Sequence, residues 1–533
     1  MNILKKLVGE TAIYGLSSVV GRLLNYLLVP LYTDVFLPGD YGIVTEIYAY
    51  VAFLVILLTY GLETAFFRFS KKDGKTKYVY STALISLITS SIVFVILMFT
   101  SSSGIASWIG SPENPEYVQW FALIVALDAI SSISFAKLRA QNKAIRFTLI
   151  RVISIFVNVG LNLYFIVYQQ NHEIQYIFIA NLIASIITIV LLSPEMLDSS
   201  WRFDKVLWKK MMLYALPLLV AGFAGITNEA IDRILLKKIE QPTVIYDGYL
   251  EKIKQQILYF EKQQPKLDSL SYKKIKKLKE ANSSIYEDII ACKKTFKNLP
   301  NKSKEYIIME AKNTELGLYG AFYKLSILMT LFIQTFRYAA EPFFFTQEKT
   351  KNSRKTYADV MKYFTVIMAI IFLVVIIFYD FIQGIFILGS EYHDERGFLV
   401  VSILLLANLF LGIYYNLSIW YKLTDKTKYG AYLSVFGATI TLALNIALIP
   451  IFGFLGAAWA TLVCYFSMTM ASYFIGRRHF FVPYQLRRIG LYLSIMLGIY
   501  LIIYVSRKTE EINLWVNLLY LAGFIILMAY QMI

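Results

Sequence analysis

Charged side chains interrupt several long apolar runs of this 533-residue chain. A charge inside such a run is costly unless it faces a water-filled cavity or a partner, so these residues are functional candidates. Arginine or lysine there could bind an anion, and a carboxylate could pair with a cation or bind a coupling ion. The deep charges are Arg22, Glu46, Asp128, Glu229 and Lys324, and those nearer the ends of the runs include Arg151, Asp232, Arg233 and Arg337.

Other chemistry-bearing residues are few. The three histidines, His172, His393 and His479, fall in loops, and Cys292 and Cys464 are too few for a disulfide framework or a Cys-ligated metal site. The chain has no G-x-x-x-x-G-K-[ST] phosphate-binding motif. We therefore expect no cofactor, no metal site and no catalytic residue, which argues against an enzyme.

The elements that hold these charges are predicted to be membrane helices. Hydrophobic residues make up 57% of the chain and charged residues only 17%, whereas soluble proteins carry about 25% charged residues. Apolar blocks of roughly 20 residues match the thickness of a bilayer, and their continuity excludes a β-barrel. The predicted fold is all-α and polytopic, with fourteen spans at about 11–33, 43–66, 78–100, 117–137, 148–168, 176–192, 211–235, 316–341, 357–380, 398–421, 430–450, 455–476, 490–506 and 513–532.

Lysine and arginine are distributed unequally between the two sets of loops. The short loops on one side hold only Arg396, Arg507 and Lys508, while the loops on the side of the N-terminus are rich in both residues. The positive-inside rule then places both termini in the cytoplasm. The net charge of +16 is attributed to loops that face anionic lipid, and we expect no nucleic-acid partner.

One hydrophilic, Lys-rich segment, residues 241–315, breaks the series of spans. The topology places it outside, and long loops translocate regardless of their charge. Apolar residues at helical spacing predict a small helical hairpin or bundle there. The alternative is a solvated appendage without a function of its own.

The two halves of the chain resemble each other. Tyr41-Gly42 corresponds to Tyr319-Gly320, and at the same offset Glu46 corresponds to Lys324. This predicts two parallel six-helix repeats with a site between two lobes. The predicted organisation is an N-lobe of spans 1–6 (1–210), span 7 opening the C-lobe (211–240), the insertion (241–315), the rest of the C-lobe (316–482) and two additional spans (483–533).

Several motifs resemble those of polysaccharide flippases of the multidrug/oligosaccharidyl-lipid/polysaccharide exporter superfamily. They are Leu138-Arg139-Ala140-Gln141-Asn142-Lys143-Ala144, Asp232-Arg233, Gly317-Leu318-Tyr319-Gly320-Ala321-Phe322-Tyr323-Lys324-Leu325, and Asn445-Ile446-Ala447-Leu448-Ile449-Pro450. The resemblance implies a bacterial plasma-membrane protein that moves isoprenoid-pyrophosphate-linked oligosaccharide to the outer leaflet by alternating access. Membrane lipids surround it, and the insertion would offer a surface to a glycan polymerase or an export partner.

The resemblance also implies a cationic cavity, and arginine or lysine would bind the pyrophosphate there. Arg22 and Lys324 are the first candidates, with an internal ion pair as the alternative for each. Arg151 and Arg337 would receive the headgroup near the cytoplasmic ends, unless they extend to the interface.

A second group of charges is expected to act in gating or coupling. The repeat places Glu46 and Lys324 at equivalent heights, which predicts an outer-gate salt bridge between them. Asp128 and Glu229 could pair with cations or bind a coupling ion, and Asp232 with Arg233 could instead close a helix end. The sequence leaves open a drug or cation antiporter of the same superfamily, a membrane glycan-assembly enzyme, and a scaffold.

Overall fold

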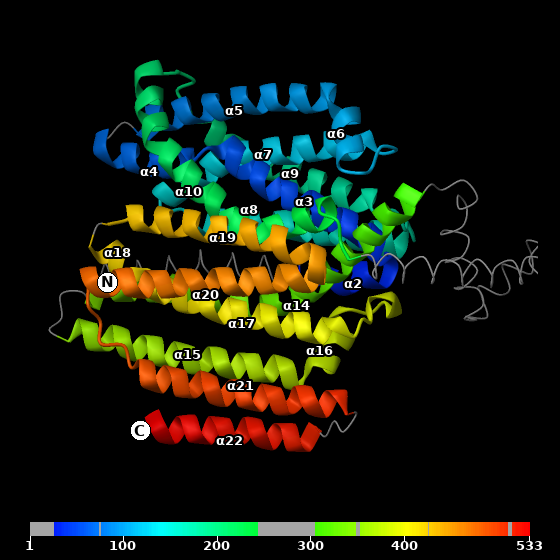
Figure 1. Cartoon of the computed structure of the whole chain (residues 1–533). Helices are drawn as coiled ribbons and strands as arrows, with labels where there is room; N and C mark the ends of the chain where they lie inside the picture. The colour runs from blue at the N-terminus through cyan, green and yellow to red at the C-terminus, as the bar shows by residue number, and fades with distance from the viewer. Residues whose placement is uncertain are drawn as a thin grey trace, which may run out of the picture.

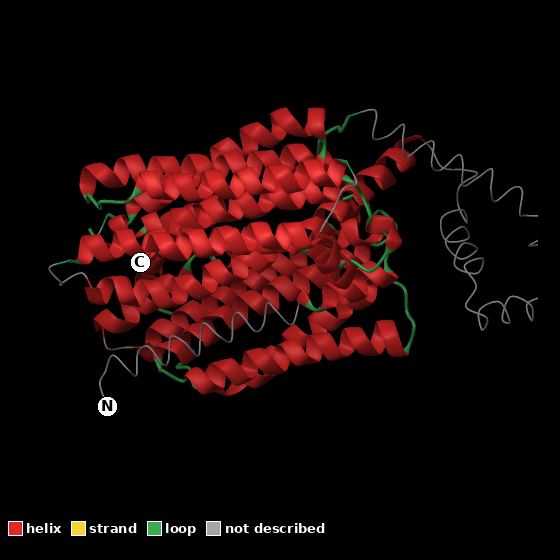
Figure 2. Cartoon of the chain, turned by 90° about the horizontal axis from the view of Figure 1, so that it is seen from below, coloured by secondary structure: helices red, strands yellow, loops and turns green. Residues whose placement is uncertain are grey.

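The protein is a bundle of long, roughly parallel helices. The computed structural model describes residues 26–73, 76–242, 304–347, 352–424, 426–509 and 514–532. Within these residues the regular structure is helical and includes no strand (Figure 2). The predicted all-helical, polytopic membrane fold is confirmed.

Twelve helical segments of the described residues are long and apolar enough to cross a membrane. They coincide with the predicted spans 2–13. The predicted span 14 is a shorter apolar helix, and most of the predicted span 1, including Arg22, lies outside the described residues. The count of fourteen therefore stays a prediction.

The helices of the first half form the N-lobe, which is at the top of Figure 1. They are α2 (Leu28–Val35), α3 (Pro38–Thr59), α4 (Leu62–Asp73), α5 (Thr76–Thr100), α6 (Ser102–Trp108), α7 (Pro115–Ala140), α8 (Ala144–Asn162), the π-helix η1 (Leu163–Tyr168) and α9 (Gln175–Leu197). Pro38 and Pro115 occupy the first turns of α3 and α7, where a missing N–H leaves no hydrogen bond unmade.

The C-lobe begins with α10. It comprises α10 (Lys205–Lys238), α14 (Lys304–Gln347), α15 (Ser353–Ile377), α16 (Tyr379–Phe386), the 3-10 turn η3 (Ser390–Tyr392), α17 (Arg396–Leu417), α18 (Ile419–Leu423), α19 (Lys428–Phe452) and α20 (Phe454–His479). Two further helices, α21 (Leu486–Lys508) and α22 (Leu514–Met532), pack beside α15 at the edge of the C-lobe (Figure 1).

The same helix pairs recur in the two lobes. In the N-lobe, α7 packs against α5 and α9, and α8 packs against α9. In the C-lobe, α17 packs against α15 and α20, and α19 packs against α20. These pairs join equivalent spans of the two halves, which supports the predicted six-plus-six repeat.

The longest described helix is α14, which has 44 residues. Its described part starts at Lys304, so residues 304–315, the end of the predicted insertion, are continuous with span 8. Glu315, at the predicted end of the insertion, is buried and accepts two hydrogen bonds from Arg396, at 2.8 and 2.9 Å. Residues 243–303 of the predicted insertion, with Cys292, lie outside the described residues.

The lobes meet directly where α3 begins, and we call this end of the bundle the outer end. A methyl group on Gly42 would lie 1.9 Å from the carbonyl oxygen of Asn313 on α14, and one on Gly317 would lie 1.8 Å from that of Pro38 on α3. Only glycine allows backbones to approach so closely.

Four glycines at repeat-equivalent positions form this contact. Gly39 and Gly42 of α3 correspond to Gly317 and Gly320 of α14 at the offset that also relates Tyr41 to Tyr319. We call these four residues the glycine seam. At the seam the backbones of α3 and α14 are in direct contact, which closes the space between the lobes at the outer end.

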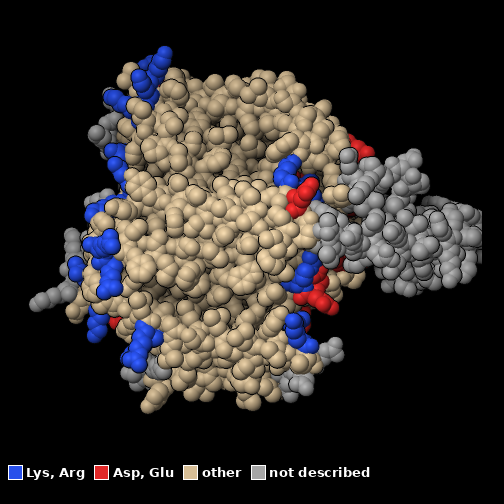
Figure 3. All heavy atoms as spheres, in the orientation of Figure 1, with Lys and Arg blue, Asp and Glu red and all other residues tan. Residues whose placement is uncertain are grey.

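Charged residues are concentrated at the two ends of the bundle. On the face shown in Figure 3, lysine and arginine edge the end opposite to the seam, which we call the inner end. Acidic and basic residues both occur at the outer end, and the band between the ends is almost free of either (Figure 3). This distribution is expected of a chain whose middle lies in lipid.

Candidate functional site

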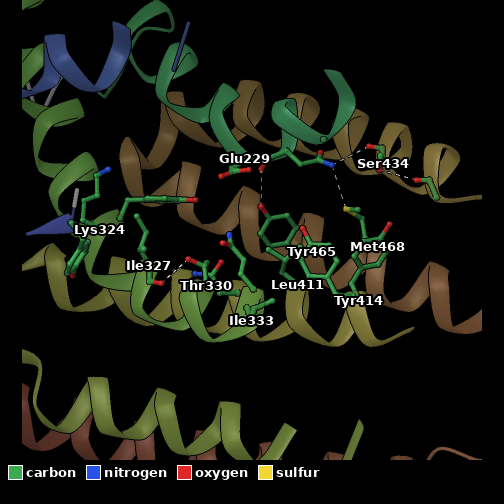
Figure 4. Close-up of a pocket in the computed structure, with 18 of the residues that line it drawn as sticks. Glu229, Lys324, Ile327, Thr330, Ile333, Leu411, Tyr414, Ser434, Tyr465 and Met468 are labelled. Atoms are coloured by element: carbon green, nitrogen blue, oxygen red, sulfur yellow. Dashed lines mark hydrogen bonds between the residues drawn. The ribbon is translucent and has the colours of Figure 1, made fainter. Parts of the chain in front are cut away.

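Two adjoining cavities lie at the centre of the protein. The inter-lobe cavity has a volume of about 270 Å³ and is bounded by α2, α3, α10 and α14. The C-lobe cavity has a volume of about 450 Å³ and is lined mainly by α10, α14, α17, α19 and α20 (Figure 4). Glu229, Tyr323, Lys324 and Ile327 line both, so the two spaces form one central cavity.

Two cations face the inter-lobe cavity. Lys324 of α14 makes no ion pair or hydrogen bond with any described residue. The Arg233 guanidinium donates to the backbone oxygen of Glu229 at 3.0 Å and lies 4.1 Å from the centre of the Tyr323 ring. Neither has a carboxylate within ion-pairing distance among the described residues, so the cavity offers positive charge that its wall offsets only in part.

Asp232, which precedes Arg233, has a structural role. Its carboxylate is buried and accepts a 2.6 Å hydrogen bond from the hydroxyl of Tyr319. It also accepts a hydrogen bond from the backbone N–H of Arg233. These bonds tie α10 to α14 and hold Arg233 on the face that lines the cavity.

One carboxylate, Glu229, lines the central cavity among the described residues. Its side chain projects into the space above Tyr465 and Leu411 (Figure 4). The cavity therefore combines two cations with a single acid, and its described lining has a net positive charge.

The C-lobe cavity is lined by hydroxyl and amide groups. Asn228 donates to the backbone oxygen of Ser434 at 3.2 Å, and Tyr465 donates to the backbone oxygen of Asn228 at 3.3 Å (Figure 4). The Arg337 guanidinium lies 4.2 Å from the centre of the Tyr415 ring, which belongs to the wall. The other polar lining residues include Tyr26, Tyr323, Gln334, Asn408, Tyr414 and Tyr421. Such a lining suits a ligand rich in hydroxyl groups.

Two sequence candidates belong to the N-lobe and do not line the central cavity. Asp128 of α7 accepts a 3.0 Å hydrogen bond from Ser185 of α9. Arg151 of α8 stacks on the Phe135 ring, with its guanidinium 4.0 Å from the ring centre. Their proposed roles in headgroup reception and coupling stay predictions.

The predicted outer-gate pair requires Glu46 to face Lys324, and the structure does not show this arrangement. Glu46 forms an ion pair of 2.5 Å with Lys237 of α10, and both side chains are nearly inaccessible to solvent. Lys237 also donates to the backbone oxygen of Ile109 at 2.7 Å. Lys237 lies one helical turn beyond Arg233 on α10. At that position its side chain reaches Glu46 of α3.

Fold and cavity together define a two-lobed helical membrane protein with a central cavity. The family model "Polysaccharide biosynthesis protein" matches residues 35–245. No curated protein matches the chain in sequence.

Solved structures show the same fold. A lipid II flippase, MurJ, in an inward closed conformation has 13% identity and a TM-score of 0.57, and the match covers 97% of this chain and 98% of that one. An inward-facing multidrug resistance MATE transporter of the MOP superfamily has 12% identity and a TM-score of 0.56, covering 90% and 94%. The MATE multidrug transporter DinF-BH has 15% identity and a TM-score of 0.56, covering 90% and 97%.

These similarities confirm the resemblance to polysaccharide flippases of the multidrug/oligosaccharidyl-lipid/polysaccharide exporter superfamily. The family model covers most of the N-lobe and α10, and the structural matches extend over both lobes. The structural neighbours are transporters and flippases, in keeping with the expectation that the chain is not an enzyme.

Proposed function

We propose that the protein is a flippase that moves isoprenoid-pyrophosphate-linked oligosaccharide from the inner to the outer leaflet by alternating access. The observation that carries this proposal is the pair Lys324 and Arg233, two cations without a carboxylate partner among the described residues, in a cavity between the lobes. No covalent bond is made or broken.

The charge of the cavity suits a diphosphate. A cation held away from water without a counter-ion is costly, and an anionic ligand relieves that cost. Arginine binds phosphate oxygens through two parallel N–H bonds, and lysine adds a compact point charge. Lys324 and Arg233 would thus bind the diphosphate, with Arg22 as a further candidate, and Arg337 and Arg151 would act nearer the inner end.

The adjoining C-lobe cavity suits the sugars. Its tyrosine hydroxyls and amides donate and accept hydrogen bonds, and its rings offer flat apolar faces. The lipid tail would remain in the bilayer while the headgroup crosses. The glycine seam closes the outer end, so release on that side requires the seam to part.

The orientation follows from charge. The inner end carries the lysine and arginine edge and would face the cytoplasm of a bacterial cell, with both termini on that side. The insertion would then extend from the outer surface, where a glycan polymerase or an export partner is accessible.

The test is flipping of a fluorescent isoprenoid-pyrophosphate sugar in proteoliposomes, read by quenching from outside. Losing one charge-assisted hydrogen bond costs about 1.5–3 kcal/mol, so Lys324→Ala and Arg233→Ala should each slow flipping by roughly 10- to 150-fold. Lys324→Arg should retain part of the rate. Lys209→Ala, which removes an exposed lysine at the inner end of α10, is the matched control and should flip normally.

Normal flipping by Lys324→Ala together with Arg233→Ala would contradict the proposal. So would loss of the folded protein from the membrane in both variants. The first result would show that the two cations take no part in flipping, and the second that they are needed for folding.

Glu229 favours a second candidate, a drug or cation antiporter. A single acid in the cavity could carry a proton or another cation in exchange for a positively charged drug. Proton-driven uptake of a cationic dye that is lost in Glu229→Gln, by a protein that does not flip lipid-linked sugar, would establish this function in place of the first.

A further inference from the structure

A third cavity, distinct from the central one, opens at the outer end of the C-lobe. Its volume is about 770 Å³, and it shares no lining residue with the central cavity. Its walls come from α16, the loop before α17, the first turn of α17 and the last turns of α21. We call it the outer pocket.

Charges of both signs are balanced in the outer pocket. Asp380, Asp394 and Glu395 face Arg396, Arg507 and Lys508. Arg507 holds Asp380 through two bonds of 2.8 and 2.5 Å, and Arg396 holds Asp394 through bonds of 2.9 and 2.7 Å. A site for an anion or a cation would show an excess of one sign. Among the described residues no group of His, Cys, Asp and Glu could hold a metal ion.

Several polar groups of the pocket have no partner in the described chain. The side chains of Gln383, His393 and Glu395 make no hydrogen bond or ion pair there. The hydroxyl of Tyr379, a residue only 2% exposed, is buried at the pocket wall without a hydrogen-bond partner among the described residues. Such a hydroxyl is costly, but its oxygen is buried behind the surface of the pocket, whereas His393 and Glu395 are exposed.

Aromatic rings lie beside these polar groups. Tyr504 is partly exposed on the α21 side and is stacked on Phe398, with the ring centres 6.3 Å apart. Tyr379 meets Phe398 edge to face at 5.2 Å. A flat ring next to unpartnered amide, imidazole and carboxylate groups matches a ligand that has both apolar faces and many hydroxyls.

The N-lobe lacks this arrangement. Its equivalent of α16 is α6, which also joins the third and fourth spans of its repeat and has the sequence SSGIASW, without a charged residue. α21 has no counterpart in the N-lobe, yet it contributes Tyr504, Arg507 and Lys508 to the pocket. The pocket is therefore a property of the C-lobe and of the additional helix.

We propose that the outer pocket binds the uncharged, hydroxyl-rich sugar chain of a glycan at the outer surface. Gln383, His393 and Glu395 would bond its hydroxyls, and Tyr504 would stack on a sugar ring. The ligand class follows from the pocket itself, and its source, a chain delivered by the transporter, rests on the proposed function. Bound there, the sugar is held outside the central cavity after release.

Gly384 of α16 provides a direct test. It lines the pocket, and a Cβ atom added there would meet no heavy atom within 4 Å. Gly384→Trp therefore attaches without a clash at its Cβ atom, brings an indole to the pocket and replaces a poor helix former. The matched control is Gly104→Trp in the equivalent helix α6, where an added side chain also meets nothing within 4 Å.

The measurement is calorimetric titration of the purified protein in lipid nanodiscs with oligosaccharide fragments freed by mild acid from the surface polysaccharide of the source cells. Wild type, Gly104→Trp and Lys324→Ala should bind the free fragments, and Gly384→Trp should bind them at least about tenfold more weakly because its indole occupies the space. Inorganic pyrophosphate should show no binding that depends on Gly384.

Equal binding by Gly384→Trp and wild type, or no binding by wild type, would overturn the proposal. Loss in Lys324→Ala alone would assign the fragment to the central cavity, and pyrophosphate binding that is lost in Gly384→Trp would make the pocket an anion site. Flipping is measured in parallel. The wild-type protein could bind the fragments in a way that depends on Gly384 and yet fail to flip lipid. That result would refute the proposed transport but not the proposed sugar binding in the outer pocket.

Discussion

Glu46 and Lys237 form an ion pair across the boundary between the lobes. Their side chains are 1% and 5% exposed. Ile109 accepts a second hydrogen bond from the ammonium group, and Tyr50 donates one to the carboxylate. A buried pair is favourable when its remaining hydrogen-bonding capacity is filled in this way. The pair therefore stabilises the contact of α3 with α10 at the outer end.

We predict that either Glu46→Gln or Lys237→Met alone destabilises the protein strongly. Removing one partner strands the other charge in a buried site, at a cost of about 3–5 kcal/mol. The double variant should recover much of that loss. Thermal unfolding in detergent provides the measurement, and Lys209→Met, at an exposed position of the same helix, should change little. Strictly additive effects of the two single changes would show that the pair is not coupled.

Of the residues that line the central cavity, the charged ones could be predicted from the sequence and the neutral ones could not. Lys324, Glu229 and Arg233 are detectable because a charge is rare in an apolar run. The tyrosines were missed because tyrosine is also common at membrane interfaces. Only the rotation of each helix, set by packing, separates Tyr414 and Tyr465 in the cavity from Tyr530 on the surface. Likewise, the sequence does not show that α10, rather than α14, supplies the lysine that pairs with Glu46.

The α3–α14 contact determines how closely the lobes approach at the outer end. Its backbones touch at Gly42 and Gly317, with no side chain between them. Close backbone approach is a common way to associate helices in lipid, where the hydrophobic effect is absent. A small change in side-chain size there should alter the balance between closed and open states.

We predict that Gly42→Ala opens the outer end. The added methyl group would lie 1.9 Å from a backbone oxygen of α14, so the helices must separate. Spin labels at exposed Ser103 and Glu391, in a background without Cys292 and Cys464, should report a longer distance. Gly160→Ala of α8, where an added methyl group meets nothing within 4 Å, should leave the distance unchanged. An unchanged distance in Gly42→Ala would show that the seam does not set the closed state.

Helix boundaries were predicted within a few residues because long apolar runs are unambiguous. The predicted spans 2–13 all correspond to helices, and the two additional helices exist as α21 and α22. The boundary at residue 315 was harder to place. The polarity of residues 304–315 predicts that they belong to the insertion, yet they continue into α14 as one helix, in which Glu315 is held by Arg396.

At the scale of the whole molecule, the proposed transport requires the two lobes to move against each other. The outer end is closed by the seam and by Tyr392, whose hydroxyl donates to the backbone oxygen of Phe36 at 2.9 Å. Fixing the lobes in this state should stop transport without disturbing either lobe.

We predict that a disulfide between Thr45→Cys and Gly320→Cys locks the protein. A Cβ atom on residue 320 would lie 3.4 Å from the Cβ of Thr45, close to the separation of about 3.5–4.5 Å in disulfides. Oxidation should abolish flipping in proteoliposomes, and a reductant should restore it. Each single cysteine variant is the control and should be insensitive to oxidation. Full flipping with the disulfide formed would show that α3 and α14 need not separate.

The glycine seam also has a consequence for how the two repeats meet. Its two sides are copies of one short motif, so a surface of the repeat meets its own duplicate. An isologous contact, the type that joins identical subunits about a two-fold axis, would repeat every approach in both directions. Here Gly42 meets Gly317, the copy of Gly39, whereas Gly39 meets Glu310 and Thr314, and Gly320 meets Thr45. The motif therefore meets its own copy with a shift of about one helical turn, so the two lobes use the same glycines for different contacts.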